Sequence, residues 1–261
     1  MRQLRTLDAL KQYPMYARDG EVGKPRQVYF DDEQWVVRYF VVHAGSRLFG
    51  RDVLIAPGAV IGVNDDSGRI ELDLALEQVE KAPPIVSELP VSRHYEIEYH
   101  RHFGWPPYWA TSIDGAPLLM PPAPPPPPPE APAEPVREPE NPHLRDSAEV
   151  IGYHLQARDG ELGHIRDLVL DDETWAVRYF VVDTGTWLPG RKVLIAPTWI
   201  EAVSWLEHAM VVGLERDLIR TAPVYEPGRL ISHDDEVRLY AHYGKSVQQH
   251  DATAQRGGPA G

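Results

Sequence analysis

Asp31–Val42 reads DDEQWVVRYFVV, and nearly the same stretch returns at Asp171–Val182 as DDETWAVRYFVV. The two occurrences are 140 residues apart, and this offset holds without a gap over a longer segment. Between Ala17–Pro57 and Ala157–Pro197, 26 of 41 positions are identical. Self-similarity at one fixed offset is typical of a duplicated structural unit. The chain therefore consists of two copies of one unit, and each copy is organised around this stretch.

The stretch predicts a polar turn followed by the strongest strand of the unit. Asp31–Gln34 is polar, whereas Trp35–Val42 is dense in β-branched and aromatic residues, which favour strands. In the first copy, further strands are expected at Val22–Phe30, Val53–Ala56, Val60–Val63 and Ile70–Leu74. Short strands separated by turns, with no long helix between them, predict an all-β fold. We expect a small antiparallel β-barrel in each copy, because closure removes exposed sheet edges.

A short helix is expected after each barrel. In the first copy it spans Ser92–Phe103, where Tyr95, Tyr99 and Phe103 recur at a spacing of four residues on one face. In the second copy Ser232 is the predicted N-cap of the helix. The inward side of this second helix is expected to carry Val237, Tyr240 and Tyr243.

Composition divides the chain into four regions. Residues 1–120 are expected to form the first barrel with its helix and an aromatic extension, and residues 143–247 the second barrel with its helix. Between them, residues 121–142 are a proline-rich linker that contains six consecutive prolines at Pro124–Pro129. This composition favours an extended polyproline II spacer, although a motif for proline-reading domains remains an alternative. Residues 248–261 are expected to be a disordered tail.

Charge and composition exclude several classes of protein. The net charge of −13 and the lack of a basic tract argue against nucleic-acid binding, which depends on lysine and arginine. Without cysteine, neither disulfides nor thiolate metal sites can form. No apolar run reaches the roughly 20 residues needed to span a bilayer, and the N-terminal residues do not resemble a secretory signal. We expect a cytoplasmic protein and leave peripheral membrane association open.

No catalytic, cofactor or metal site is predicted. There is no nucleophile motif and no phosphate-binding glycine loop. His94, His100 and His102 lie close in sequence, but residues two apart on a helix point to different faces, so packing is favoured over metal binding. The repeated Asp-Asp-Glu triplet is interpreted as a turn rather than a cation site, since aspartate favours turns. Arg51 and Arg191 are expected to form rim salt bridges rather than an anion site.

An aromatic segment after the first helix carries the strongest functional signal. Trp105, Tyr108 and Trp109 lie in a proline-broken stretch that the second copy lacks. Tryptophan and tyrosine are common anchors of protein contacts, because they bury a large area at a small entropic cost. The same residues could instead fold back and cover the neighbouring barrel. Both interpretations stay open at this point.

Several repeated motifs resemble the PRC-barrel domain, a family shared by the cytoplasmic part of the photosynthetic reaction-centre H subunit and by a ribosome-maturation factor. The matching segments are ARDGE-x-G, DDE-x-W-x-VRYFVV, G-x4-GR-x-VLIAP and a later Ala-Pro turn, each present twice. Trp35 and Arg38, with Trp175 and Arg178, mark the signature strand. The resemblance covers both globular halves and excludes the linker.

The resemblance implies a barrel of about six strands and a role in docking or assembly without general catalysis. A non-enzymatic protein-interaction module with an unidentified protein partner is therefore expected. Two alternatives follow from the family, an accessory role in photosynthetic or membrane electron-transfer complexes and binding in ribosome maturation. We further expect the two barrels to pair within the chain, with Trp35, Trp175 and the RYFVV strands at a quasi-twofold interface.

Overall fold

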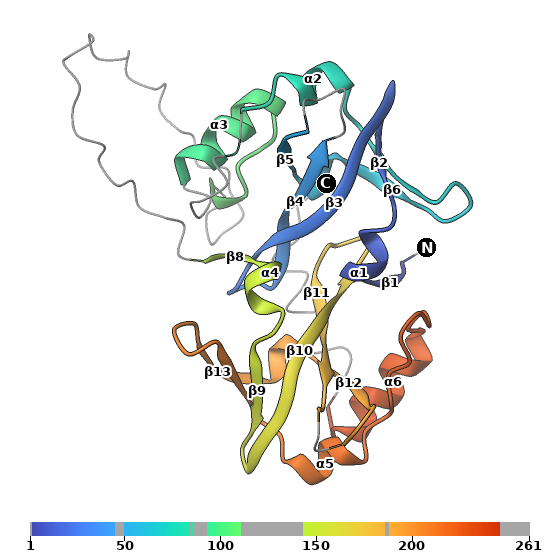
Figure 1. Cartoon of the computed structure of the whole chain (residues 1–261), viewed down its shortest axis with the longest axis vertical. Helices are drawn as coiled ribbons and strands as arrows, with labels where there is room; N and C mark the ends of the chain where they lie inside the picture. The colour runs from blue at the N-terminus through green and yellow to red at the C-terminus, as the bar shows by residue number, and fades with distance from the viewer. Residues whose placement is uncertain are drawn as a thin grey trace, which may run out of the picture.

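The computed structural model describes residues 2–44, 50–83, 85, 93–110, 143–185 and 188–245. The expected linker at 121–142 and tail at 248–261 lie outside these residues. In Figure 1 the upper lobe contains most elements of the first copy, and the lower lobe contains most elements of the second. Strands dominate both lobes, as the sequence predicts.

The two copies contribute the same succession of elements, except that the first ends with an additional element, η3. The first copy forms β1 (Leu4–Thr6), α1 (Leu7–Leu10), β2 (Met15–Ala17), β3 (Gly20–Asp31), β4 (Val36–Ala44), β5 (Asp52–Ile55), η2 (Pro57–Ala59), β6 (Val60–Asn64), β7 (Arg69–Leu72), α2 (Leu76–Glu80), α3 (Arg93–Phe103) and η3 (Tyr108–Ala110). The second forms β8 (Leu144–Asp146), α4 (Ser147–Val150), β9 (His154–Ala157), β10 (Gly160–Asp171), β11 (Val177–Asp183), β12 (Lys192–Ile195), η4 (Pro197–Trp199), β13 (Ile200–Ser204), β14 (Ala209–Val212), α5 (Arg216–Arg220) and α6 (His233–His242).

The strands form two mixed sheets of seven strands each. One follows the order β5-β4-β3-β2-β7-β6 and the other β12-β11-β10-β9-β14-β13. The expectation of a purely antiparallel barrel is not met, because β2 pairs with β7, and β9 with β14, in parallel. The two end strands of each sheet are also not paired with each other among the described residues. The pattern of apolar residues gives the faces of a strand but not its direction.

The seventh strand of each sheet comes from the other copy. β1 pairs antiparallel with β10, with Thr6 opposite Val169, and β8 pairs antiparallel with β3, with Asp146 opposite Tyr29. The short helices follow their strands, so α1 packs on β10 and α4 on β3. In Figure 1, β8 and α4 accordingly lie against the upper lobe, and the N-terminal elements lie beside β10 and β11. The copies are thus joined by a reciprocal exchange of their first strand and helix.

The repeated aspartates hold the exchanged strands in place. Asp172 accepts hydrogen bonds from the Gln3 backbone N–H at 2.7 Å and from Arg5 Nε at 2.9 Å. Asp32 accepts the equivalent hydrogen bond from Arg145 Nε at 2.8 Å. The preceding aspartate of each copy caps its own turn, as in the bond from the Glu33 N–H to Asp31 Oδ1 at 3.0 Å. The turn interpretation of the triplet is confirmed, and its second carboxylate also binds the other copy.

The two tryptophans of the repeated stretch lie at the quasi-twofold centre. Trp35 and Trp175 end their turns with φ values of +54° and +59°, so neither belongs to the strand that follows. Their carbonyl oxygens accept the N–H groups of Val177 at 2.7 Å and of Val37 at 2.9 Å in the opposite copy. The Trp35 ring also meets the edge of Phe180, and the Trp175 ring that of the equivalent Phe40. The two copies therefore pack together at these strands, as the sequence predicts.

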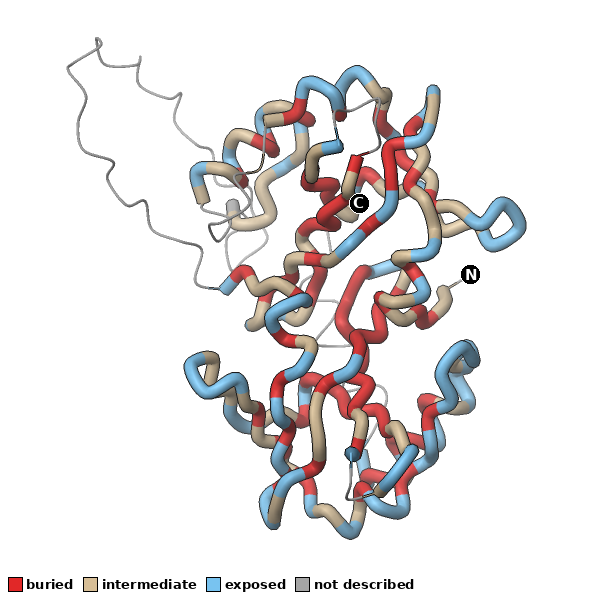
Figure 2. Tube along the Cα trace, in the orientation of Figure 1, coloured by how far each residue is buried: buried red, intermediate tan, exposed pale blue. Residues whose placement is uncertain are grey.

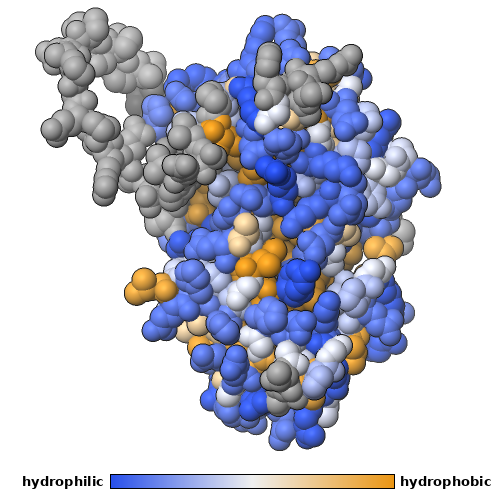
Figure 3. All heavy atoms as spheres, viewed as in Figure 1, coloured by the Kyte–Doolittle hydropathy of each residue, from blue (hydrophilic) through white to orange (hydrophobic). Residues whose placement is uncertain are grey.

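One apolar core runs through both lobes. The buried residues of the two copies form a single cluster, which includes Leu7 and Leu10 of α1. Figure 2 shows buried backbone continuing from lobe to lobe where β4, β10 and β11 meet. On the face drawn in Figure 3, hydrophilic side chains predominate and apolar atoms gather where the lobes meet. The paired copies are thus held together by shared apolar burial, the dominant favourable contribution to folding.

The two predicted helices form, with one error in the face that α6 buries. The Ser232 hydroxyl caps α6 by accepting the Asp235 N–H at 3.2 Å, as predicted. Val237, however, is 45% exposed, whereas Tyr240 and Tyr243 are buried. A spacing of three residues falls about 60° short of a full turn, so two such steps rotate Val237 away from the core. Leu239 packs inward in its place.

Two carboxyl groups at the exchanged elements, the partly buried Asp146 and the buried Asp167, predict a stability that falls as the pH rises. Burial raises the pKa of Asp146, which caps α4, and that of Asp167 on β10, each to about 6. The folded protein then binds protons more tightly than the unfolded chain, whose aspartates titrate near the ordinary value of about 3.9. Ionisation of these two groups therefore lowers the free energy of unfolding. This loss is absent below about pH 4, grows between about pH 4 and 6, and is complete above pH 6.

We therefore expect Asp146→Asn with Asp167→Asn to stabilise the protein at pH 7.5 by about 1–3 kcal/mol, because the folded state no longer buries these charges. At pH 4.5 the same variant should differ much less from the wild type. Urea unfolding of both proteins at the two pH values measures the difference. An equal effect of the substitutions at both pH values would contradict this assignment.

Candidate functional site

In each copy a buried glutamate of the C-terminal helix is hydrogen-bonded to a buried tyrosine of the strand beneath that helix. The Tyr39 hydroxyl donates to Glu96 Oε1 at 3.1 Å, and the Tyr179 hydroxyl donates to Glu236 Oε1 at 2.8 Å. Both glutamates are buried in their helices and stand 140 residues apart. This pair is not predicted from the sequence. The signal that could reveal it is the glutamate that both helices carry at the 140-residue offset although most of their other residues differ. It fixes each helix to the signature strand.

In the second copy, arginines balance the buried carboxylate. Arg178 Nη2 donates to Glu236 Oε1 at 3.1 Å, and the Arg178 residue is only 1% exposed. Arg2 Nη2 lies 3.4 Å from the other oxygen of Glu236, and Arg2 Nε donates to Asp171 at 2.5 Å. The signature arginine is thus a buried structural partner here, and the exchanged N-terminal segment completes the network.

Removal of this carboxylate should be costly. Glu236→Ala leaves the buried Arg178 guanidinium without its carboxylate, and breaking a buried ion pair in this way costs about 3–5 kcal/mol. Urea unfolding at pH 7 measures the loss, with Glu207→Ala on an exposed turn as the control. The control should change stability by less than about 0.5 kcal/mol. A cost below about 1 kcal/mol for Glu236→Ala would refute the structural role of the pair.

In the first copy the same position carries a different set of partners. Arg93 Nη1 lies 2.9 Å from Glu96 Oε2, and the Tyr108 hydroxyl donates to the same carboxylate. His100 replaces the Tyr240 of the second copy, and its Nε2 lies 2.8 Å from the Tyr39 hydroxyl oxygen. Burial lowers the pKa of His100, which favours the neutral ring. The histidine is therefore packed, as expected.

In the first copy the signature arginine, Arg38, does not bind the helix glutamate and contacts the aromatic segment instead. Arg38 is bound to Asp31 at 3.2 Å instead of to the helix, and its guanidinium lies 4.1 Å from the centre of the Tyr108 ring. A cation over an aromatic face contributes about 0.5–2 kcal/mol. Burial, followed by the nearby Glu96 charge, raises the pKa of Tyr108. In the first copy Arg93 therefore pairs with the buried glutamate in place of the signature arginine, which packs against Tyr108 instead.

Trp105, Tyr108 and Trp109, which we call the aromatic cover, fold back on α3. Trp105 stacks on Phe103 with ring centres 4.3 Å apart, and the Trp109 ring lies 4.7 Å from that of His100. All three are only partly buried. They therefore cover the polar cluster of the first copy and still present aromatic surface to solvent. Their use as partner contacts stays a prediction.

The remaining candidates from the sequence have structural partners. His102 Nε2 lies 2.7 Å from the Gln78 carbonyl oxygen, and His242 lies 2.8 Å from that of Leu218. His94 is paired with Glu98 at 3.4 Å. Among the residues that the structure describes, Arg51 and Arg191 do not form the predicted rim salt bridges. Both arginines donate to backbone carbonyls at the ends of the short helices that follow them, α2 and α5, including the bond from Arg191 to the Arg220 oxygen at 2.8 Å.

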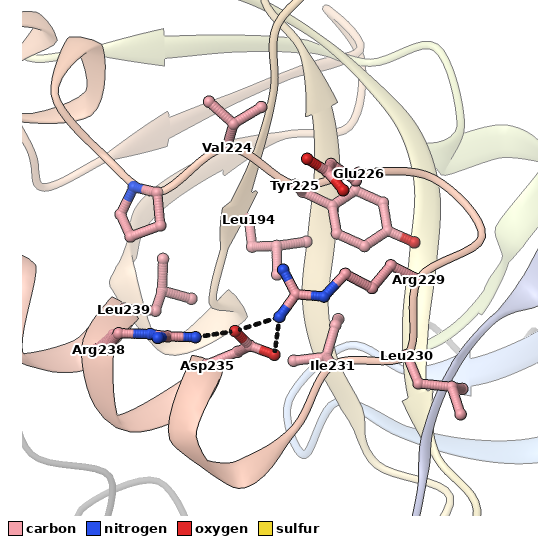
Figure 4. A pocket seen from close by; sticks show the side chains of 11 residues that line it. Leu194, Val224, Tyr225, Glu226, Arg229, Leu230, Ile231, Asp235, Arg238 and Leu239 are labelled. Atoms are coloured by element: carbon pink, nitrogen blue, oxygen red, sulfur yellow. Dashed lines mark hydrogen bonds and ion pairs between the residues drawn. The ribbon is translucent and has the colours of Figure 1, made fainter.

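The second copy carries a hollow that was not predicted from the sequence. Its volume is about 180 Å³, and it lies between α6, β12 and the segment that follows α5. Its apolar lining consists of the buried residues Leu194, Tyr225 and Leu239 and of the exposed residues Pro223, Val224 and Leu230. Figure 4 shows Asp235 across this hollow, bound to Arg229 and Arg238. The lining is mainly apolar with a few charged groups, as is usual for binding pockets.

The part of the chain that the structure describes contains no group of three or more histidine or acidic residues arranged to hold a metal ion. Among the same residues, no helix has both the length and the apolar character needed to cross a bilayer. The sequence matches no protein-family model, and it has no significant match among curated proteins.

Proposed function

We propose that this chain is a non-enzymatic protein-interaction module built from two PRC-barrel-like units. In this proposal the paired units form a rigid scaffold, and the aromatic cover and the hollow of the second copy are its contact surfaces. The six strands that each copy supplies to its own sheet support a PRC-type unit.

One observation carries the proposal: the two copies share the residues of the tryptophan centre, whereas the aromatic cover lies in the first copy and the hollow in the second. The repeated residues form the tryptophan centre and supply the aspartates that bind the exchanged strands. The differing residues form the aromatic cover in one copy and the hollow in the other. Aromatic anchors and preformed pockets are the features through which proteins recognise each other.

The buried ionisable groups give further support, because the structure uses them for its own stability. Glu96 binds Arg93 and two tyrosine hydroxyls, and Glu236 binds Arg178 and a tyrosine. Catalytic acids and bases need access to a substrate proton. These two carboxylates are instead buried between their own helices and the sheet, away from solvent. We therefore assign them to the scaffold.

Affinity purification from the native host, followed by mass spectrometry, tests the proposal. The wild type should retain a reproducible set of proteins, and Trp105→Ala with Trp109→Ala should lose some of them by at least fivefold. Circular dichroism must show that the variant is folded, and Leu206→Ala on a distant exposed turn serves as the control. Identical retention by the wild type, by a Leu239→Tyr variant that fills the hollow and by the aromatic-cover variant would refute the proposed surfaces.

A further inference from the structure

The first copy shows what fits the hollow of the second. The helices α3 and α6 occupy equivalent places, because His102 and His242 contact equivalent carbonyl oxygens at 2.7 and 2.8 Å. The bonds from Trp105 N to the His100 oxygen and from Lys245 N to the Tyr240 oxygen, both at 2.9 Å, confirm this correspondence. Residues 140 apart on these helices therefore face equivalent surroundings.

At one such position the first copy has an aromatic ring and the second does not. Tyr99 is completely buried, and its hydroxyl donates to the Pro83 carbonyl oxygen at 2.5 Å. The equivalent residues of the second copy are Leu239 and Pro223, and both line the hollow. A leucine in place of tyrosine removes the outer part of the ring and the hydroxyl. The hollow thus lies where the first copy places its own phenol group.

We propose that this hollow binds the side chain of a tyrosine supplied by a partner protein. Its volume of about 180 Å³ is enough for one ring, because an engineered apolar cavity of about 150 Å³ binds benzene. Leu194, Leu239 and Tyr225 supply apolar walls, and by its correspondence with Pro83 we assign the Pro223 carbonyl as the acceptor for the phenol hydroxyl. The proposal rests on the proposed function for the nature of the ligand, a protein.

The rim of the hollow favours a polypeptide over a free phenol. Val224 and Leu230, which are 49% and 56% exposed, flank the opening. A free phenol in the hollow leaves them in water, whereas the residues around a bound tyrosine can cover them. The ion pairs of Asp235 with Arg229 and Arg238, at 2.8 and 2.5 Å, place polar groups beside them. An aromatic anchor in an apolar pocket with a polar rim is the usual centre of a protein interface.

Titration of the full chain with p-cresol, followed by methyl NMR, tests the hollow itself. Saturable shifts are expected at Leu194, Val224 and Leu239. Toluene should bind about three- to tenfold more weakly, since it lacks the hydrogen bond to Pro223. Leu239→Tyr restores the ring of the first copy and should abolish binding, whereas Val237→Tyr places the same side chain on the exposed face of α6 and should not.

Absence of shifts in the wild-type hollow would overturn the proposal, and this result does not depend on whether Leu239→Tyr folds. Equal binding of p-cresol by Leu239→Tyr would overturn it as well.

A peptide library displayed to the full chain then tests whether the ligand is a polypeptide. Enrichment of tyrosine at one fixed position with the wild type and Val237→Tyr, but not with Leu239→Tyr, supports a protein ligand. Binding of p-cresol without enrichment would refute the protein ligand and assign the hollow to a small phenol. The proposed function would then still be tested independently through the aromatic cover.

Discussion

Trp175→Ala is expected to destabilise the protein by about 3–5 kcal/mol, the usual cost of removing a buried tryptophan. Trp175 is 5% exposed at the quasi-twofold centre, and its ring contacts Phe40 of the other copy with centres 4.8 Å apart. Trp35 is only partly buried, so Trp35→Ala should cost less. The loss is a large fraction of a typical stability of 5–15 kcal/mol. Urea unfolding measures both variants.

The phenylalanine variants at the same positions provide the control. They keep a ring against the opposite copy and should retain more than half of the stability that alanine loses. If Trp175→Ala costs less than about 1 kcal/mol, or if Trp35→Ala costs clearly more, the tryptophan centre does not hold the two copies together as described.

Gly163→Ala is the second substitution with a large expected effect, and Gly23→Ala is its counterpart in the first copy. Gly163 has a φ of +140° on β10, and an added Cβ would lie 2.0 Å from the Asp183 backbone oxygen. Gly23, at +151°, meets the His43 oxygen at the same distance. Backbone strain of about 1–3 kcal/mol adds to the cost of forcing β10 and β11 apart. We expect a loss of about 3 kcal/mol or more.

Gly68→Ala is the matched control, because Gly68 also has a positive φ, at +61°, but a Cβ there would meet nothing within 4 Å. Its cost should stay near 1–2 kcal/mol, the strain of the left-handed conformation alone. Thermal unfolding of the Gly163→Ala, Gly23→Ala and Gly68→Ala variants separates the cost of backbone strain from the cost of forcing the strands apart. Equal losses in all three would show that the close approach of the strands does not matter.

Much of each unit could be predicted from the repeated sequence. Alternating and β-branched residues place β3, β4, β5 and their counterparts, and the strong conservation between copies places the tryptophan centre. Strand direction could not be predicted, which is why the parallel pairing of β2 with β7 was missed. Trp35 was assigned to a strand because its type favours strands, whereas the turn before it ends in a left-handed residue.

The exchange of β1 and β8 is invisible in the sequence for a physical reason. The exchanged strands read Leu-Arg-Thr and Leu-Arg-Asp, and both sockets carry the same Asp-Asp-Glu triplet. Each strand can therefore form the same arginine–aspartate bond in either copy. The local chemistry does not distinguish an exchanged from an unexchanged arrangement, and only the paths of the connecting chain do. A strand of three residues is in any case too short to show a periodic pattern.

The aromatic cover was found in the sequence, but its polar partners were not. Trp105 and its neighbours stand out because prolines surround them and the second copy lacks them. Glu96 and His100 belong to the same cluster, yet a single glutamate or histidine in a helix has many uses. The hollow depends on Leu239 in place of Tyr99, a difference that matters only once both helices are known to dock alike.

Disulfide trapping tests the central claim, the reciprocal exchange, most directly, because the chain has no cysteine of its own. Thr6 lies opposite Val169 of the second copy, and directly opposed residues of antiparallel strands have Cα atoms about 4.5–5.5 Å apart, within the range of a disulfide. Tyr29 is the position equivalent to Val169 in the first copy. We predict that Thr6→Cys with Val169→Cys forms an intramolecular disulfide under mild oxidation, as seen by mass spectrometry, and that Thr6→Cys with Tyr29→Cys does not. Bond formation only in the second variant would contradict the exchange.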